Sequence, residues 1–79
     1  MKEIQHFILR ALLAADGPMS QDALISATKH GMQARPLESD IKRAINELES
    51  GKYIDGADDA IDGRQLALTT KGTIKAKQL

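Results

Sequence analysis

The sequence predicts an α+β fold in which three helices are followed by a small β-hairpin and a short C-terminal helix. Apolar residues recur about every 3.6 positions up to Ser50, and after Gly51 the period falls to two. A length of 79 residues predicts a single domain over residues 1–79, without internal repeat or linker. The chain has no cysteine, so no disulfide reinforces the small core that so short a chain builds.

The first predicted helix covers residues 1–15. One apolar stripe runs along it at helical spacing and comprises Ile4, Phe7, Ile8, Ala11, Leu12 and Ala15. The sequence Asp16-Gly17-Pro18 ends this helix, because glycine and proline both disfavour its continuation.

A second apolar edge on this helix, formed by Leu9 and Leu13, lies roughly opposite the stripe. The C-terminal segment around Ile74 is one candidate to cover this edge within the same chain. A homodimer contact through Leu9 and Leu13 is the alternative.

The second predicted helix covers residues 21–30 and follows a short extended segment, 18–20. Ser20 is placed to cap it, and Met19 has the spacing from Leu24 of a hydrophobic staple. Lys29 and His30 fall in the last turn, where the helix dipole favours cations. Gly31 is expected to close the helix in the left-handed conformation.

The third predicted helix covers residues 36–50, with Pro36 at its first position and Ser50-Gly51 at its end. Its expected buried stripe comprises Leu37, Ile41, Ala44, Ile45 and Leu48. We expect Ile41, Ile45 and Leu48 to pack against Phe7, Ile8 and Leu24.

A β-hairpin is predicted after Gly51. Tyr53-Ile54 begins one strand, and Leu66 and Leu68 alternate with Gln65 and Ala67 in the other, so Ile54, Leu66 and Leu68 should close its base. A loop over residues 56–63 is expected to join the strands. Thr69 or Thr70 then caps a last short helix that contains Ile74.

This order of elements resembles a winged helix-turn-helix domain over nearly the whole chain. The resemblance is best in the second and third helices, in the segment Leu48–Ile54, and in the segment Leu66–Gly72 that closes the hairpin. The last of these is similar to the end of the wing in multiple-antibiotic-resistance-type repressors, where an Asp-x-Arg precedes it as Asp62-Gly63-Arg64 does here. This chain departs in having a shorter interval from that arginine to the Leu-Thr pair and a wing tip rich in acid.

The resemblance implies a transcriptional regulator that binds double-stranded DNA, with the helix 36–50 as recognition helix in the major groove. The face of this helix opposite the apolar stripe is centred on Ser39, Lys42, Arg43, Asn46 and Ser50 and contains no acid. Lysine and arginine reach phosphates or guanine, and asparagine pairs with adenine. The predicted DNA-binding residues are Arg35, Ser39, Lys42, Arg43, Asn46 and Arg64. The alternative for this face is an ordinary solvated surface of mixed charge.

Two features count against DNA. The formal net charge is zero, and the wing tip would present Asp58, Asp59 and Asp62 to phosphates. A winged-helix adaptor that binds protein and not DNA is therefore the alternative function. A calcium site in this loop fails the EF-hand pattern, beginning with Ala60 where an oxygen ligand is needed.

The sequence predicts no enzyme, cofactor or metal site. Ser26 and His30 lie one turn apart, but no third group is placed to orient the histidine. Neither His6 nor His30 belongs to a recognised metal motif. No apolar run approaches the ~20 residues that cross a bilayer, and the N-terminus lacks the layout of a signal peptide. We therefore expect no membrane association and a cytoplasmic location.

Overall fold

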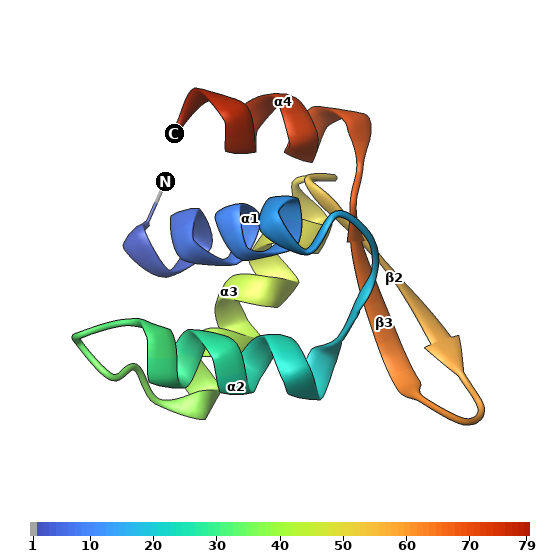
Figure 1. Ribbon diagram of the computed structural model, residues 1–79, viewed down its shortest axis with the longest axis horizontal. Coiled ribbons are helices and arrows are strands. Elements are labelled where there is room, and N and C mark those ends of the chain that lie inside the picture. The colour runs from blue at the N-terminus through green and yellow to red at the C-terminus, as the bar shows by residue number, and fades with distance from the viewer. Residues whose placement is uncertain (1) are drawn as a thin grey trace.

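Four helices and a three-stranded antiparallel sheet form the chain in a computed structural model that describes residues 2–79 (Figure 1). The elements in order are α1 Glu3–Ala15, β1 Met19–Ser20, α2 Gln21–Gly31, α3 Glu38–Ser50, β2 Ile54–Asp59, β3 Gly63–Leu68 and α4 Thr70–Gln78. The strand order is β1-β3-β2, so the short segment before α2 adds a third strand to the hairpin. The predicted α+β class is confirmed.

The core lies between the helices and the base of the hairpin. Its buried members are Ile8, Leu9, Leu12, Leu24, Ile25, Ile41, Ala44, Ile45, Leu48, Ile54, Leu66 and Ala76. The predicted burial of Ile41, Ile45 and Leu48 is therefore confirmed. Leu68 is only half-buried against the same core. Phe7 is half-buried and does not belong to this core, contrary to the prediction, because its ring lies against Gly31.

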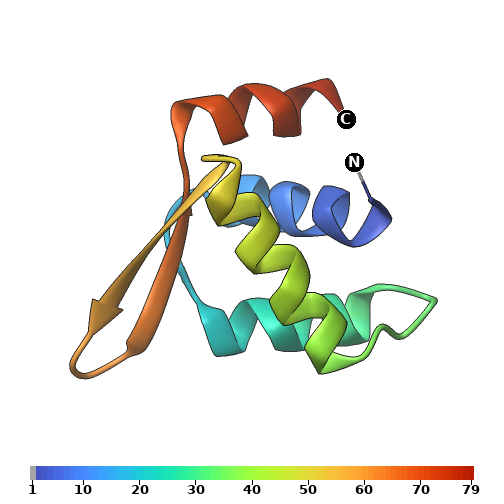
Figure 2. The same ribbon diagram turned by 180° about the vertical axis from the view of Figure 1, so that it is seen from behind.

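The apolar edge of α1 is covered within the chain. Leu9 has no exposed surface and belongs to the core, and Leu13 is half-buried against it. Helix α4 runs along α1 in both views and contributes Ala76, whereas Ile74 stays 55% exposed (Figures 1 and 2). The homodimer contact through Leu9 and Leu13 is thus wrong for Leu9, because a side chain buried in its own monomer cannot face a partner.

The ends of α2 show one correct and one incorrect prediction. Ser20 caps the helix, since its Oγ accepts a hydrogen bond from the Ala23 N–H at 3.1 Å. Gly31 does not adopt the left-handed conformation but is the last helical residue. A Cβ built on Gly31 would lie 2.5 Å from Cζ of Phe7, so the glycine makes room for the aromatic ring.

Helix α3 begins two residues later than predicted. Leu37 is its N-cap, and the Leu37 carbonyl accepts from the N–H groups of Asp40 and Ile41. Pro36 therefore precedes the helix. Leu37 has an extended backbone and lies before the first helical turn, so its side chain does not follow the buried face of α3. The side chain is 67% exposed, and Leu37 does not belong to the buried stripe, contrary to the prediction.

The strands of the hairpin are longer than predicted and the loop is shorter. Pairing runs from Ile54↔Leu68 to Asp59↔Gly63, which leaves only residues 60–62 as the turn, where a loop over 56–63 was expected. Asp59 closes this turn, because its Oδ1 accepts from the N–H groups of Ile61 at 2.7 Å and Asp62 at 3.1 Å. The sequence predicted the start of β2 but not its extension, because residues 56–59 show no alternation of apolar and polar side chains.

The first turn of α4 is fixed to the connection between α3 and β2. Thr69 caps α4 by accepting from the Gly72 N–H at 3.0 Å, and its own N–H donates to the Tyr53 carbonyl at 3.1 Å. The Thr69 hydroxyl also donates to the Lys52 carbonyl at 2.6 Å. A Cβ built on Gly72 would lie 1.8 Å from the Tyr53 carbonyl oxygen, so only glycine allows this approach. Lys71 reinforces the contact, with its Nζ 4.4 Å from the centre of the Tyr53 ring.

Candidate nucleic-acid interface

The outward face of α3 carries most of the predicted DNA-contacting residues. Figure 2 shows α3 crossing in front of α1 and α2, with no other element over its outer side. Its inward face is buried in the core through Ile41, Ala44, Ile45 and Leu48. The exposed face carries Ser39, Lys42, Arg43 and Asn46, all of which are solvent-exposed. Because Ser39 and Lys42 are three apart and Lys42 and Asn46 four apart, these side chains are neighbours on one helix surface.

The cations of this face differ in their electrostatic partners. Arg43 Nη1 lies 3.5 Å from Asp40 Oδ1, and both side chains are largely exposed at 66% and 41%. A pair so open to water is weak and is screened by salt, so Arg43 remains available to another anion. Within residues 2–79, Lys42 makes no ion pair. Glu47 lies on the flank of the helix and accepts from Gln5 Nε2 at 3.1 Å, which ties its carboxylate to α1.

Arg35 lies in the connection between α2 and α3, near the start of α3. It is exposed and has a φ of +49°, a left-handed conformation that a non-glycine residue adopts in tight turns. Its N–H donates to the Met32 carbonyl at 3.1 Å, which closes the turn. The structure thus places Arg35 next to the N-terminal end of α3, where the sequence predicted it.

Arg64 is held against the body of the molecule by two partners, unlike the other predicted residues. Its Nη1 donates to Gln21 Oε1 at 3.1 Å at the start of α2, and its Nη2 donates to Glu49 Oε2 near the end of α3. Its side chain is 34% exposed. A Cβ built on Gly56 would lie 2.6 Å from Nη2, so the guanidinium passes over a glycine of β2. Arg64 therefore joins the hairpin to α2 and α3 in this structure, a role that sequence reasoning missed.

The hairpin is acidic and protrudes from the body of the molecule (Figures 1 and 2). Its exposed carboxylates are those of Asp55, Asp58, Asp59 and Asp62. The two backbone N–H groups that bind Asp59 hold the pKa of its carboxyl below the ordinary value of 3.8. At the tip, Ile61 is 92% exposed. The tip thus combines negative charge with one apolar side chain in water.

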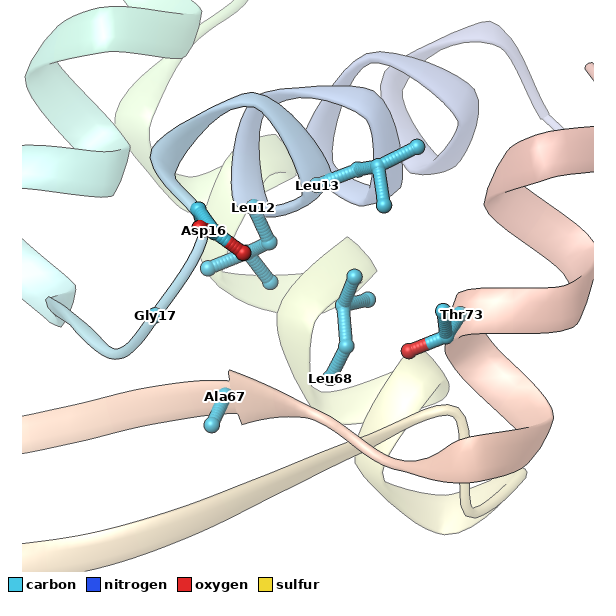
Figure 3. Close-up of a pocket in the computed structure, with 7 residues that line it drawn as sticks. All are labelled: Leu12, Leu13, Asp16, Gly17, Ala67, Leu68 and Thr73. Carbon is cyan, nitrogen blue, oxygen red and sulfur yellow. The ribbon is translucent and has the colours of Figure 1, made fainter.

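A cavity of about 260 Å³ lies on another side of the molecule, where the end of α1 meets β3 and α4 (Figure 3). It is lined by Leu12, Leu13, Asp16, Gly17, Ala67, Leu68 and Thr73. Its walls are mainly apolar, with Asp16 and Thr73 as polar members, and it contains none of the predicted site residues.

Ser26 and His30 are both exposed on α2, and no hydrogen bond joins them in residues 2–79. Within the same residues, no three histidine or acidic side chains lie close enough together to hold a metal ion. None of the helices described is long and apolar enough to cross a membrane.

Comparison of the chain with known protein families, with characterised proteins and with solved structures finds no match. Two exposed features of the chain bear on function: the outward face of α3, which carries Lys42 and Arg43, and the acidic hairpin. Arg64 connects the hairpin to α3 through Glu49.

Proposed function

We propose that this chain is a winged helix-turn-helix domain that binds double-stranded DNA and acts as a small transcriptional regulator. The observation that carries the proposal is the outward face of α3, which is exposed along its length and carries Ser39, Lys42, Arg43 and Asn46. The order of three helices, hairpin and C-terminal helix supports the assignment, with β2–β3 as the wing.

The proposed contacts follow from the chemistry of these side chains. The major groove is about 12 Å wide and admits an α-helix. Lys42 and Arg43 neutralise phosphates or donate to guanine, and Asn46 pairs with the edge of an adenine. Arg35, at the N-terminal end of α3, is suited to a phosphate contact that positions the helix without specifying sequence.

The acidic wing makes the proposed interface small. Asp58 and Asp59 repel phosphates, and Arg64 is held by Glu49 and Gln21. Binding is therefore carried by α3 and the turn before it. We expect modest affinity with strong salt dependence.

A protein-binding adaptor is the second candidate function, and the hairpin tip favours it. An isoleucine that is 92% exposed beside Asp59 and Asp62 suits a basic protein surface better than it suits a duplex. On this hypothesis α3 is a solvated helix face.

The test is a titration of fluorescently labelled random duplex with the protein at several salt concentrations. Charge reversal in Lys42→Glu/Arg43→Glu should nearly abolish binding, and the slope of log K against log salt should fall by about 1.8, about 0.9 for each phosphate contact. The matched control is Lys75→Glu/Lys77→Glu on α4, which changes the net charge equally but lies away from α3. If both double variants lose affinity equally, binding is a general response to charge and the recognition role of α3 is wrong.

Base recognition is tested separately on a duplex site selected from a random library. Asn46→Ala should relax the preference at one base pair while leaving affinity for random duplex nearly unchanged. The adaptor hypothesis expects no salt-dependent binding of duplex even at low ionic strength.

A further inference from the structure

The contact between Arg64 and Glu49 joins the wing to the end of the proposed recognition helix. Arg64 is the only cation between Ile54 and Leu68, so it is the one group of the hairpin that attracts phosphate. Its Nη2 donates to Glu49 Oε2, and its Nη1 donates to Gln21 Oε1 at 3.1 Å. The two ion-paired side chains remain 34% and 24% exposed. The cation is therefore paired, but water and small anions still reach it.

The carboxylate of Glu49 is incompletely satisfied in this contact. Its Oε2 binds Arg64, whereas its Oε1 is buried and has no hydrogen-bond partner in the described part of the chain. A buried polar atom without a partner carries a desolvation cost that the ion pair must offset. The contact is therefore less stable than a fully bonded pair of the same geometry.

A phosphate is a better partner for the same guanidinium. It offers several strong acceptor oxygens to the planar fork of an arginine. A duplex that lies on α3 would bring a backbone phosphate to the border between α3 and the hairpin, where Arg64 lies. Asp58 lies opposite Arg64 in the β2–β3 register, and its carboxylate repels a phosphate, so the exchange requires a duplex that α3 already holds in place.

We propose that Glu49 is an autoinhibitory partner of Arg64, which a DNA phosphate displaces when the duplex is in place. This inference rests on the proposed DNA-binding function. Until displacement, the hairpin contributes only its acidic residues, so it opposes loose, non-specific contact. After displacement, Arg64 adds one phosphate contact from the wing.

Two variants release Arg64 by different means. Glu49→Gln removes the charge of its partner. Gly56→Ala leaves every charge in place but puts a methyl group where the guanidinium now lies, and Gly56 has no left-handed φ that would forbid alanine. The control Glu47→Gln removes the same charge from the exposed flank of α3 without touching Arg64.

We expect Glu49→Gln to raise affinity for random duplex about fivefold and to steepen the salt slope by about 0.9, the value for one added phosphate contact. Glu47→Gln should raise affinity only about twofold through general charge. Gly56→Ala should raise affinity about threefold. In an Arg64→Gln background, Gly56→Ala should have no effect, and Glu49→Gln should give no more than the twofold effect of Glu47→Gln.

The outcomes separate this inference from the proposed function. Equal effects of Glu49→Gln and Glu47→Gln, together with no effect of Gly56→Ala, overturn the autoinhibitory role even when α3 binds DNA. The autoinhibitory role is also overturned if Glu49→Gln and Gly56→Ala raise duplex affinity by the same factors in the Arg64→Gln background. If instead the gains need Arg64 but reversal of Lys42 and Arg43 changes nothing, the role of α3 fails and that of Glu49 stands. If no variant binds duplex, both fail.

Discussion

Substituting Gly72 by alanine tests whether α4 is fixed to the α3–β2 connection by backbone contact. Helix propensity alone predicts that alanine in α4 stabilises the protein by about 1 kcal/mol. The structure predicts the opposite. The new Cβ would lie 1.8 Å from the Tyr53 carbonyl oxygen and 2.8 Å from the Tyr53 carbonyl carbon, and these are backbone atoms that no side-chain rotation removes.

The magnitude follows from how far α4 must move. To reach even 3.0 Å from that oxygen, the first turn of α4 must shift by about 1.2 Å, the difference between 3.0 and 1.8 Å. A shift of that size would break the bond from the Thr69 N–H to the Tyr53 carbonyl and the bond of the Thr69 hydroxyl, whose one proton is shared between the Lys52 and Tyr53 carbonyls. Each bond contributes about 0.5–1.5 kcal/mol, so the two cost about 2 kcal/mol, and after the helix-propensity gain the net loss is about 1 kcal/mol. The melting temperature of a domain this size should fall by roughly 5 °C.

Thermal and urea unfolding followed by circular dichroism measure this loss, with Gly31→Ala as the matched control. That glycine is also helical, but its added Cβ meets the edge of the Phe7 ring, a half-buried side chain that can rotate away. This overpacking should cost less than about 1 kcal/mol, and the gain in helix propensity offsets part of it, so the net loss should be clearly smaller than at Gly72. If Gly72→Ala is as stable as the unmodified protein, the close approach of α4 to Tyr53 does not exist in solution.

The remaining predictions concern the core and the hairpin turn. Ile45→Ala, at a side chain with 1% exposure, should lower the free energy of unfolding in urea by about 2–5 kcal/mol, whereas Leu37→Ala, at 67% exposure, should change it by less than about 0.5 kcal/mol. Comparable losses at the two positions would contradict the late start of α3. The carboxyl of Asp59 should titrate below 3.8 by NMR, because two N–H groups stabilise its ionised form. The pKa of Asp59 is lower in the folded protein than in the unfolded chain, so the ionised carboxylate stabilises the folded state. This stabilisation is complete above the unfolded pKa and is lost as pH falls through the folded pKa. Asp59→Asn keeps the Oδ1 acceptor, so the variant should retain the turn and lose this pH dependence of stability. If the pH dependence is unchanged in Asp59→Asn, it arises from another group.

The sequence predicted those parts of the fold that depend on local patterns. A helix that buries one face repeats its apolar residues at the helical period, so Ile41, Ile45 and Leu48 were placed in the core correctly. Caps are local as well, since the oxygens of Ser20 and Thr69 reach N–H groups three residues ahead. The outward face of α3 follows from its buried face, and its exposure was predictable in the same way.

The predictions that were wrong concern residues whose partners are distant in sequence. A glycine after a helix usually indicates a left-handed end, but Gly31 is itself helical and lies against the ring of Phe7 on another helix. The partners of Arg64 lie 15 and 43 residues away, and they meet it only because the hairpin folds back against α2 and α3. No local pattern encodes that angle, so Arg64 looked like a free cation on the wing.

The strand order β1-β3-β2 has a consequence for solubility. Both outer strands of a sheet present unpaired backbone groups that can recruit a strand from another molecule. Here one edge is β1, which is only two residues long, and the other is β2, which carries Asp55, Asp58 and Asp59. Two copies of β2 brought side by side would oppose carboxylate to carboxylate. The same acids thereby keep a protruding hairpin from nucleating the growth of a larger sheet between molecules.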